Sequence, residues 1–282
     1  MTAITPVPPK ATNAQVLSTF WAMVRKELTI LSRYPVDFIA SFAQIFIIVS
    51  IFTLAGLTFS TGGAASETTS GVVVYGFIMF MFVSDTLWTI GFNVRHEQVQ
   101  GTLEQLYLSP ASKFASLIAR VTHLLIWTSL LSFTSAVIMR SMLGSLPVYN
   151  AGRALVLLAF ILSGTFGIGF AFAALTLRVK ETANSLVNMF QFVFMILGAC
   201  FFPFSALPEW MRWISRLIPT AYGVDIFRST LMDYPPGFPE LAPVNVEIII
   251  VVAFGLIMPF VGYWLFRRAE HHAREKGSLG EY

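Results

Sequence analysis

Long apolar runs separated by short polar segments make up most of the chain. Each run exceeds the roughly 18 residues that distinguish a transmembrane helix from a buried core helix. At about 1.5 Å per residue, each is long enough to cross a hydrocarbon core about 30 Å thick. We therefore expect six transmembrane helices, approximately over residues 36–59, 72–92, 114–139, 154–177, 183–204 and 244–266.

A different pattern precedes the first run. Apolar residues recur at three- and four-residue steps, with basic residues off this stripe, until Pro35 interrupts the pattern. The stripe comprises Leu17, Phe20, Trp21, Val24, Leu28 and Leu31, and the basic residues are Arg25, Lys26 and Arg33. The pattern predicts an amphipathic helix on the membrane surface, preceded by a proline-containing tail.

The segment between the last two runs also has a helical pattern. Its apolar positions are Trp210, Trp213, Ile214 and Leu217, and its bounding prolines are Pro208 and Pro219. So short a helix cannot cross a bilayer, so we expect it to lie along or dip into the outer interface. A second short helix is predicted over about residues 220–232, with Thr220 as N-cap and Asp225 near the positive end of its dipole.

These elements predict an all-α integral membrane protein. Residues 1–35 are expected to form a cytoplasmic tail and interfacial amphipathic helix, and residues 36–266 a six-helix transmembrane domain with short re-entrant outer helices. Residues 267–282 would form a cytoplasmic C-terminal tail. No second soluble domain is indicated.

Composition agrees with this architecture, and charge orients it. Hydrophobic residues make up 56% of the chain and charged residues 12%, whereas soluble domains contain about 25% charged residues. Six spans place 13 of the 18 lysines and arginines on the side that holds both termini. The positive-inside rule makes that side cytoplasmic, which predicts a multi-pass protein of the cell inner or plasma membrane.

No basic surface interleaved with aromatic residues suggests nucleic acid. The single cysteine, Cys200, is interpreted as a small buried hydrophobic residue.

The cytoplasmic segment between the second and third runs carries the most specific local signal. Gly101 breaks the preceding helix, and Thr102 with Gln105 has the spacing of a capping box. The apolar face of the short helix that follows comprises Leu103, Leu106 and Tyr107. Because so short a helix is unstable alone, it needs a protein partner or the membrane surface. An interfacial turn without a partner remains the alternative.

The glycine-threonine-leucine-glutamate core of this segment, followed by Ser109-Pro110, resembles the cytoplasmic loop motif of ABC-2 type permeases. Residues 202–231 are similar to that family's second signature, between its fifth and sixth spans. Span count, surface helix and both motifs agree in order, so the resemblance covers nearly the whole chain. One departure is Ile218-Pro219, where many relatives have Asn-Pro.

The resemblance implies a transport subunit rather than an enzyme, with a coupling helix that docks on a separate ATPase. The residues that match this coupling site are Glu97, Gly101, Thr102 and Glu104, and the apolar face adds Leu103, Leu106 and Tyr107. In the outer re-entrant segment Pro208, Pro219 and Arg228 match the signature, and Trp210 is a further site residue of the same segment. A dimer of permeases, alike or related, would work with two ATPase chains. Membrane lipid would be the other partner of the permease.

Polar residues inside the runs are candidates for an intramembrane pair or a transport pathway. Asp85 and Arg120 lie on neighbouring predicted spans within reach of each other, which suggests an ion pair, whereas Arg120 alone extending to the interface is the alternative. Asn184, Asn188 and Gln191 form a polar stripe, suited either to interhelical hydrogen bonds or to a pathway. Small residues make one face of the fourth run, which close helix packing explains; they are Ser163, Gly167, Ala171 and Ala174.

No bound cofactor or metal is expected for this chain. It contains no Walker A sequence, so ATP and Mg²⁺ are expected on the partner ATPase. No His-rich motif with metal-ligand spacing occurs either.

An exporter of a hydrophobic small molecule, drug or lipid-linked compound is the leading hypothesis. A lipid-linked polysaccharide exporter of the same family is the alternative cargo assignment. A secondary transporter driven by an ion gradient would require several buried acid or base relays, and an intramembrane enzyme would require a His, Asp or Cys constellation. The sequence leaves the substrate, and the choice between like and unlike permease pairs, open.

Overall fold

The computed structural model describes residues 35–59, 63–99, 125–134, 146–176 and 183–275, with scattered positions in 18–33 and 136–141. Regular structure in these ranges is helical, with no β-strand. The long helices are α2 (Pro35–Phe59), α3 (Gly63–Val99), α6 (Ala151–Thr176), α7 (Ala183–Leu197) and α10 (Val244–Glu275). Shorter ones are η1 (Phe204–Ala206), α8 (Glu209–Ser215), α9 (Pro219–Leu231) and a helix over Leu125–Thr134, called the 125–134 helix below.

Three described helical stretches are long and apolar enough to cross a membrane: Thr68–Thr89 in α3, Ala151–Leu175 in α6 and Val244–Ala269 in α10. Three shorter apolar stretches, Ile39–Ile48, Leu125–Thr134 and Ser185–Leu197, fall within the other predicted runs. The described residues of the predicted surface helix are also helical, and Trp21 in it is 68% exposed. The chain is therefore a helical membrane protein, and the count of six spans stays a prediction.

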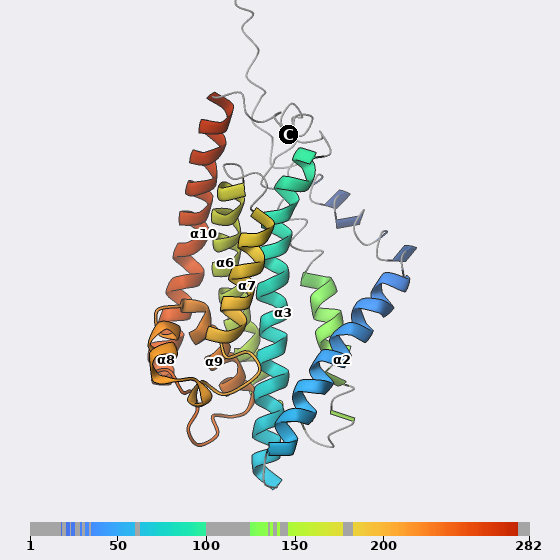
Figure 1. The fold of residues 1–282 in the computed structure, drawn as a ribbon, viewed down its shortest axis with the longest axis vertical. Coiled ribbons are helices and arrows are strands. Elements are labelled where there is room, and N and C mark those ends of the chain that lie inside the picture. Colours follow the sequence, from blue (N-terminus) through green and yellow to red (C-terminus); the bar gives the residue numbers. More distant parts are fainter. Residues whose placement is uncertain are drawn as a thin grey trace, which may run out of the picture.

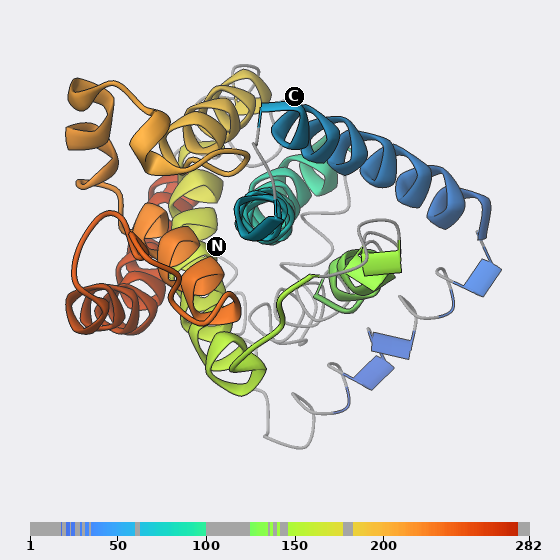
Figure 2. The same ribbon diagram turned by 90° about the horizontal axis from the view of Figure 1, so that it is seen from below.

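Helix α3 lies at the centre of the bundle. Viewed along its axis, α2, the 125–134 helix, α6 and α7 surround it (Figure 2). Its residues Val72, Val74 and Met79 are at most 3% exposed and belong to the main hydrophobic core. Helices α8 and α9 lie at the end of the bundle where α2 meets α3, opposite the C-terminal ends of α3 and α10 (Figure 1).

Helices α6 and α10 pack together more closely than side chains would normally allow. A Cβ atom added to Gly262 would lie 1.9 Å from the Gly167 carbonyl oxygen, and one added to Gly167 would lie 2.2 Å from the Met258 carbonyl oxygen. The Ser163 hydroxyl also donates a hydrogen bond to the Gly255 carbonyl at 2.8 Å. The small-residue face predicted on the fourth run is thus a helix-packing face, and Gly255 and Gly262 of α10 complete it.

The predicted fifth span is shorter than expected, because α7 ends at Leu197 rather than continuing to residue 204. The Cys200 N–H donates to the Met195 carbonyl, the Ala199 N–H donates to the Ile196 carbonyl, and Ala199 has φ +46°. These two bonds form a Schellman motif, which ends a helix by satisfying its last carbonyls. Hydropathy does not mark this end because the residues that follow are also apolar. Cys200 is fully buried and free, as predicted.

Candidate functional site

A cavity of about 490 Å³ lies between α2, α3, α7 and the 125–134 helix. Its aromatic lining consists of Phe77, Phe80, Trp127 and Phe201. The Phe80 ring stacks on Phe194 with a centroid distance of 6.4 Å and lies 5.9 Å from Phe201 at a tilt. The cavity wall is therefore a set of mutually supported rings from several segments of the chain.

The polar groups of this cavity include Gln44, Asp85 and Gln191. The Thr128 hydroxyl donates to Asp85 Oδ2 at 2.7 Å, which connects the 125–134 helix to α3. The Trp88 indole N–H donates to Gln191 Oε1 at 2.7 Å, which connects α3 to α7. Hydrogen bonds between helices thus hold both polar side chains at the cavity.

The structure brings some of the predicted intramembrane residues together and leaves others apart. Asp85 and Gln191 meet at the same cavity, although they lie on different helices. Asn188 is exposed on α7, and Asn184 lies in the same helix with its side chain outside the described part. Arg120 lies outside the described residues, so its ion pair with Asp85 stays a prediction.

A second polar centre surrounds Arg228, whose side chain is fully buried on α9. Arg228 Nη2 donates to Glu240 Oε1 at 2.8 Å and to Asp225 Oδ1 at 3.2 Å. Arg228 Nη1 donates to the backbone carbonyls of Ala199 at 3.3 Å and Phe202 at 3.2 Å. One guanidinium therefore joins α9, the turn after α7 and the loop before α10.

Aromatic rings and backbone amides complete this arginine cluster. The guanidinium carbon lies 4.9 Å from the Phe204 ring centroid and 5.3 Å from that of Phe238, within the range of cation–π attraction. Glu240 also accepts hydrogen bonds from two backbone N–H groups, those of Phe204 at 2.9 Å and Ser205 at 2.6 Å. Charge, rings and backbone donors thus hold η1 and the loop around Glu240 against α9.

Asp225 has a different role from the one predicted. It lies in the middle of α9, and its Oδ2 accepts the backbone N–H groups of Glu240 at 2.7 Å and Leu241 at 2.8 Å. Burial raises the pKa of Asp225, while the Arg228 guanidinium and these two backbone donors oppose that shift. The prediction of Thr220 as N-cap is also wrong, because Ile218 is the N-cap. Pro219 lies in the first turn of α9, where its missing N–H has no cost.

Glu247 is a third acid of this region that the sequence analysis missed. It is fully buried near the start of α10, and its Oε1 accepts the Ala242 N–H at 3.0 Å. Its Oε2 is buried without a hydrogen-bond partner among the described residues. A signal was available, because an acid at the fourth residue of an apolar run is a functional candidate. Glu240 had no such signal, since it lies in a proline-rich loop.

The remaining predicted outer residues lie on or beside α8. Pro208 precedes α8 as its N-cap, so that helix starts where the sequence predicted, and it ends at Ser215, two residues before Leu217. Trp210 is 63% exposed, and Leu217 is 81% exposed. The exposed apolar side of α8 contrasts with α9, in which all residues from Thr220 to Leu231 are buried.

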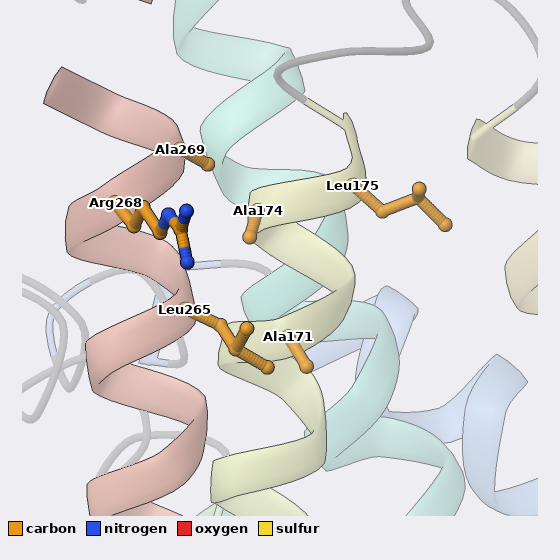
Figure 3. Close-up of a pocket in the computed structure, with 6 residues that line it drawn as sticks. All are labelled: Ala171, Ala174, Leu175, Leu265, Arg268 and Ala269. Atoms are coloured by element: carbon orange, nitrogen blue, oxygen red, sulfur yellow. The ribbon is translucent and has the colours of Figure 1, made fainter. Parts of the chain in front are cut away.

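A smaller cavity of about 400 Å³ lies between α6 and α10. Figure 3 shows Leu265, Arg268 and Ala269 of α10 pointing toward α6, where Ala174 lies opposite. The Arg268 guanidinium carbon is 5.5 Å from the Trp264 ring centroid. Space remains here because the lining side chains of α6 near Arg268 are mainly alanines.

The predicted coupling site is described at one residue only. Glu97 lies in the last turn of α3, with its side chain outside the described part. The others, Gly101, Thr102, Leu103, Glu104, Leu106 and Tyr107, lie outside the described residues. The structure does place the start of this segment at the end of α3 opposite to α8 and α9 (Figure 1). In the described ranges no cluster of His, Cys, Asp and Glu is arranged to hold a metal ion.

Comparison with known proteins adds one finding. Residues 60–266 match a protein family described as ABC-2 family transporter protein. The match extends from just before α3 to the C-terminal part of α10, so it includes the arginine cluster. It also includes the residues of α3, α7 and the 125–134 helix that line the cavity around Asp85, but not the lining residues of α2. The curated proteins compared with this chain gave no match.

Proposed function

Since the chain belongs to the ABC-2 family of membrane transporter subunits, we propose that it exports a hydrophobic small molecule, drug or lipid-linked compound from the cytoplasm. ATP is hydrolysed by a separate ABC ATPase subunit, present in two copies, and a second permease completes the assembly. The observation that carries this proposal is the family match over residues 60–266.

The proposed topology has six spans with both termini in the cytoplasm. The 13 basic residues on that side support this orientation. On this topology α8 and α9 lie at the outer face, and the exposed Trp210, Trp213 and Leu217 side chains of the α8 region suit the outer lipid interface. The segment after α3 is then cytoplasmic, where an ATPase is able to reach it.

The size of the cavity supports a small cargo over a polysaccharide. Pockets for drug-sized molecules have volumes of about 300–1,000 Å³ and mainly apolar walls. The cavity around Asp85, at about 490 Å³ with four aromatic lining residues, falls in this class. A glycan would require a longer path with many hydrogen-bonding groups.

Reconstitution tests the proposal directly. The chain and its ATPase are placed in inside-out proteoliposomes, and uptake of a fluorescent lipophilic dye is measured with ATP. We expect uptake that requires ATP and stops when the ATPase carries an inactivating change in its Walker A lysine. Uptake driven by an ion gradient without ATP would contradict the proposal and favour a secondary transporter.

Glu97 and Glu104 are expected to contribute to the ATPase contact. Exposed charge pairs contribute up to about 1 kcal/mol each, so Glu97→Gln with Glu104→Gln should weaken ATPase binding about tenfold. The measurement is the affinity of the purified permease for its ATPase, together with ATP-driven transport. Glu270→Gln with Glu275→Gln makes the same charge change near the end of α10 and should leave both unchanged. Full transport in the first double variant would show that these glutamates are not the coupling contact.

A further inference from the structure

The cavity around Asp85 combines an aromatic wall with one acid. Among its described lining residues, Asp85 is the one with a formal charge, and the other polar groups are neutral amides and a hydroxyl. Phe77, Phe80, Trp127 and Phe201 supply the aromatic rings. Packing between helices is enough to explain aromatic side chains at such a place, but it does not explain a carboxyl group.

Asp85 is only partly paired within the described part of the chain. Its Oδ2 accepts the Thr128 hydroxyl at 2.7 Å, and no described residue donates a hydrogen bond to Oδ1. Taking a carboxylate out of water is costly unless it finds a charge partner. A positively charged ligand in the cavity would supply that partner, because Asp85 itself lines the space.

The aromatic wall favours the same sign of charge. Ring faces attract cations, with about 0.5–2 kcal/mol for each contact depending on how dry the site is. An anion of equal size would meet the Asp85 carboxylate and the negative faces of the rings. Apolar surface on the ligand would be buried against the remaining aliphatic side chains of the wall.

We propose that this cavity is the cargo site and that its ligand is a hydrophobic cation, a compact apolar or aromatic body with one positive charge. Asp85 provides the opposite charge, and the four aromatic side chains hold the apolar body. Naming this ligand as cargo rests on the proposed export function, whereas its binding to the cavity does not.

Binding of tetraphenylphosphonium to the purified full-length chain tests the site. Equilibrium dialysis in detergent measures the affinity for the labelled cation, and a parallel dialysis uses tetraphenylborate, an anion of the same shape. We expect saturable binding of the cation and no saturable binding of the anion. Asp85→Asn should weaken cation binding about tenfold, and Phe80→Leu, which keeps an apolar side chain, about threefold.

Asp233→Asn is the matched control. Asp233 accepts a hydrogen bond from the Asn150 amide at 3.1 Å and does not line the cavity, so its substitution should leave the affinity unchanged. Unchanged affinity in Asp85→Asn would overturn the proposal and leave Asp85 to a structural role such as the ion pair with Arg120. Should Asp85→Asn not fold, Phe80→Leu decides, because unchanged affinity there overturns the proposal as well. Saturable binding of tetraphenylborate of similar strength would do the same.

The outcome is separate from that of the transport assay, because the dialysis contains neither ATPase nor nucleotide. Cation binding without ATP-driven export would support the cavity assignment and contradict the exporter. ATP-driven export without cation binding would support the exporter and contradict the cavity assignment.

Discussion

Arg228→Met is expected to lower the free energy of unfolding by about 3–5 kcal/mol, the usual effect of removing one partner from a buried ion pair. The substitution would leave the Asp225 and Glu240 carboxylates without their cation and the Ala199 and Phe202 carbonyls without their donor. The loop before α10 and the turn after α7 would then lose their common anchor. Thermal unfolding of the purified protein in detergent, followed by tryptophan fluorescence, measures the effect.

Two further variants distinguish the effect of the unpaired buried charges from the general effect of replacing an arginine. Arg153→Met removes an exposed arginine at the start of α6 and should change the free energy of unfolding by no more than about 0.5 kcal/mol. Adding Asp225→Asn and Glu240→Gln to Arg228→Met removes the stranded charges, so part of the lost stability should return. If Arg228→Met unfolds at the wild-type temperature, the arginine cluster does not hold the turn after α7 and the loop before α10 in place.

Gly262→Val is expected to cause the second large effect, by separating α6 from α10. The added Cβ would lie 1.9 Å from the Gly167 carbonyl oxygen, and a backbone atom cannot move aside as a flexible side chain does. Overpacking typically costs about 1–3 kcal/mol, and the backbone contact here places Gly262→Val at the upper end of that range. We expect lower yield of monodisperse protein and a lower unfolding temperature.

Gly152→Ala provides the comparison for this prediction. Gly152 lies in the first turn of α6, and a Cβ there would meet no atom within 4 Å. Because alanine is the better helix former, this substitution should be neutral or slightly stabilising. Equal tolerance of both substitutions in a thermostability assay would refute the close crossing of α6 and α10.

Hydropathy located most helices well, because lipid sets the length and the apolar character of a span. The run predicted over residues 36–59 corresponds to α2, and that over 154–177 corresponds to α6. The end of α7 was missed for a physical reason. Gly198 and the positive φ of Ala199 end the helix, but both lie inside an apolar run that hydropathy scores as continuous.

The site was less predictable, because its contacts join residues distant in sequence. Arg228 was found through a motif, yet its partner Glu240 lies twelve residues away across an irregular loop and follows no helical spacing. Asp85 and Gln191 were both singled out, but only the packing of α3 against α7 shows that they line one cavity. Small residues on α6 were recognised, whereas the facing Gly255 and Gly262 required knowledge of which helix is the neighbour.

Because α3 is continuous, a displacement at one of its ends is transmitted to the other end without an intervening loop. Its 37 residues form one uninterrupted helix about 55 Å long. At one end lies Glu97, a residue of the proposed ATPase contact. Toward the other, a Cβ on Gly76 would lie 2.1 Å from the Cys200 carbonyl oxygen, so the backbones of α3 and the turn after α7 touch. A shift of the Glu97 end along the helix axis therefore moves the contact at Cys200, beside the arginine cluster, by nearly the same amount. On the proposed function, a displacement at the ATPase contact would then reach the turn after α7 through one stiff helix.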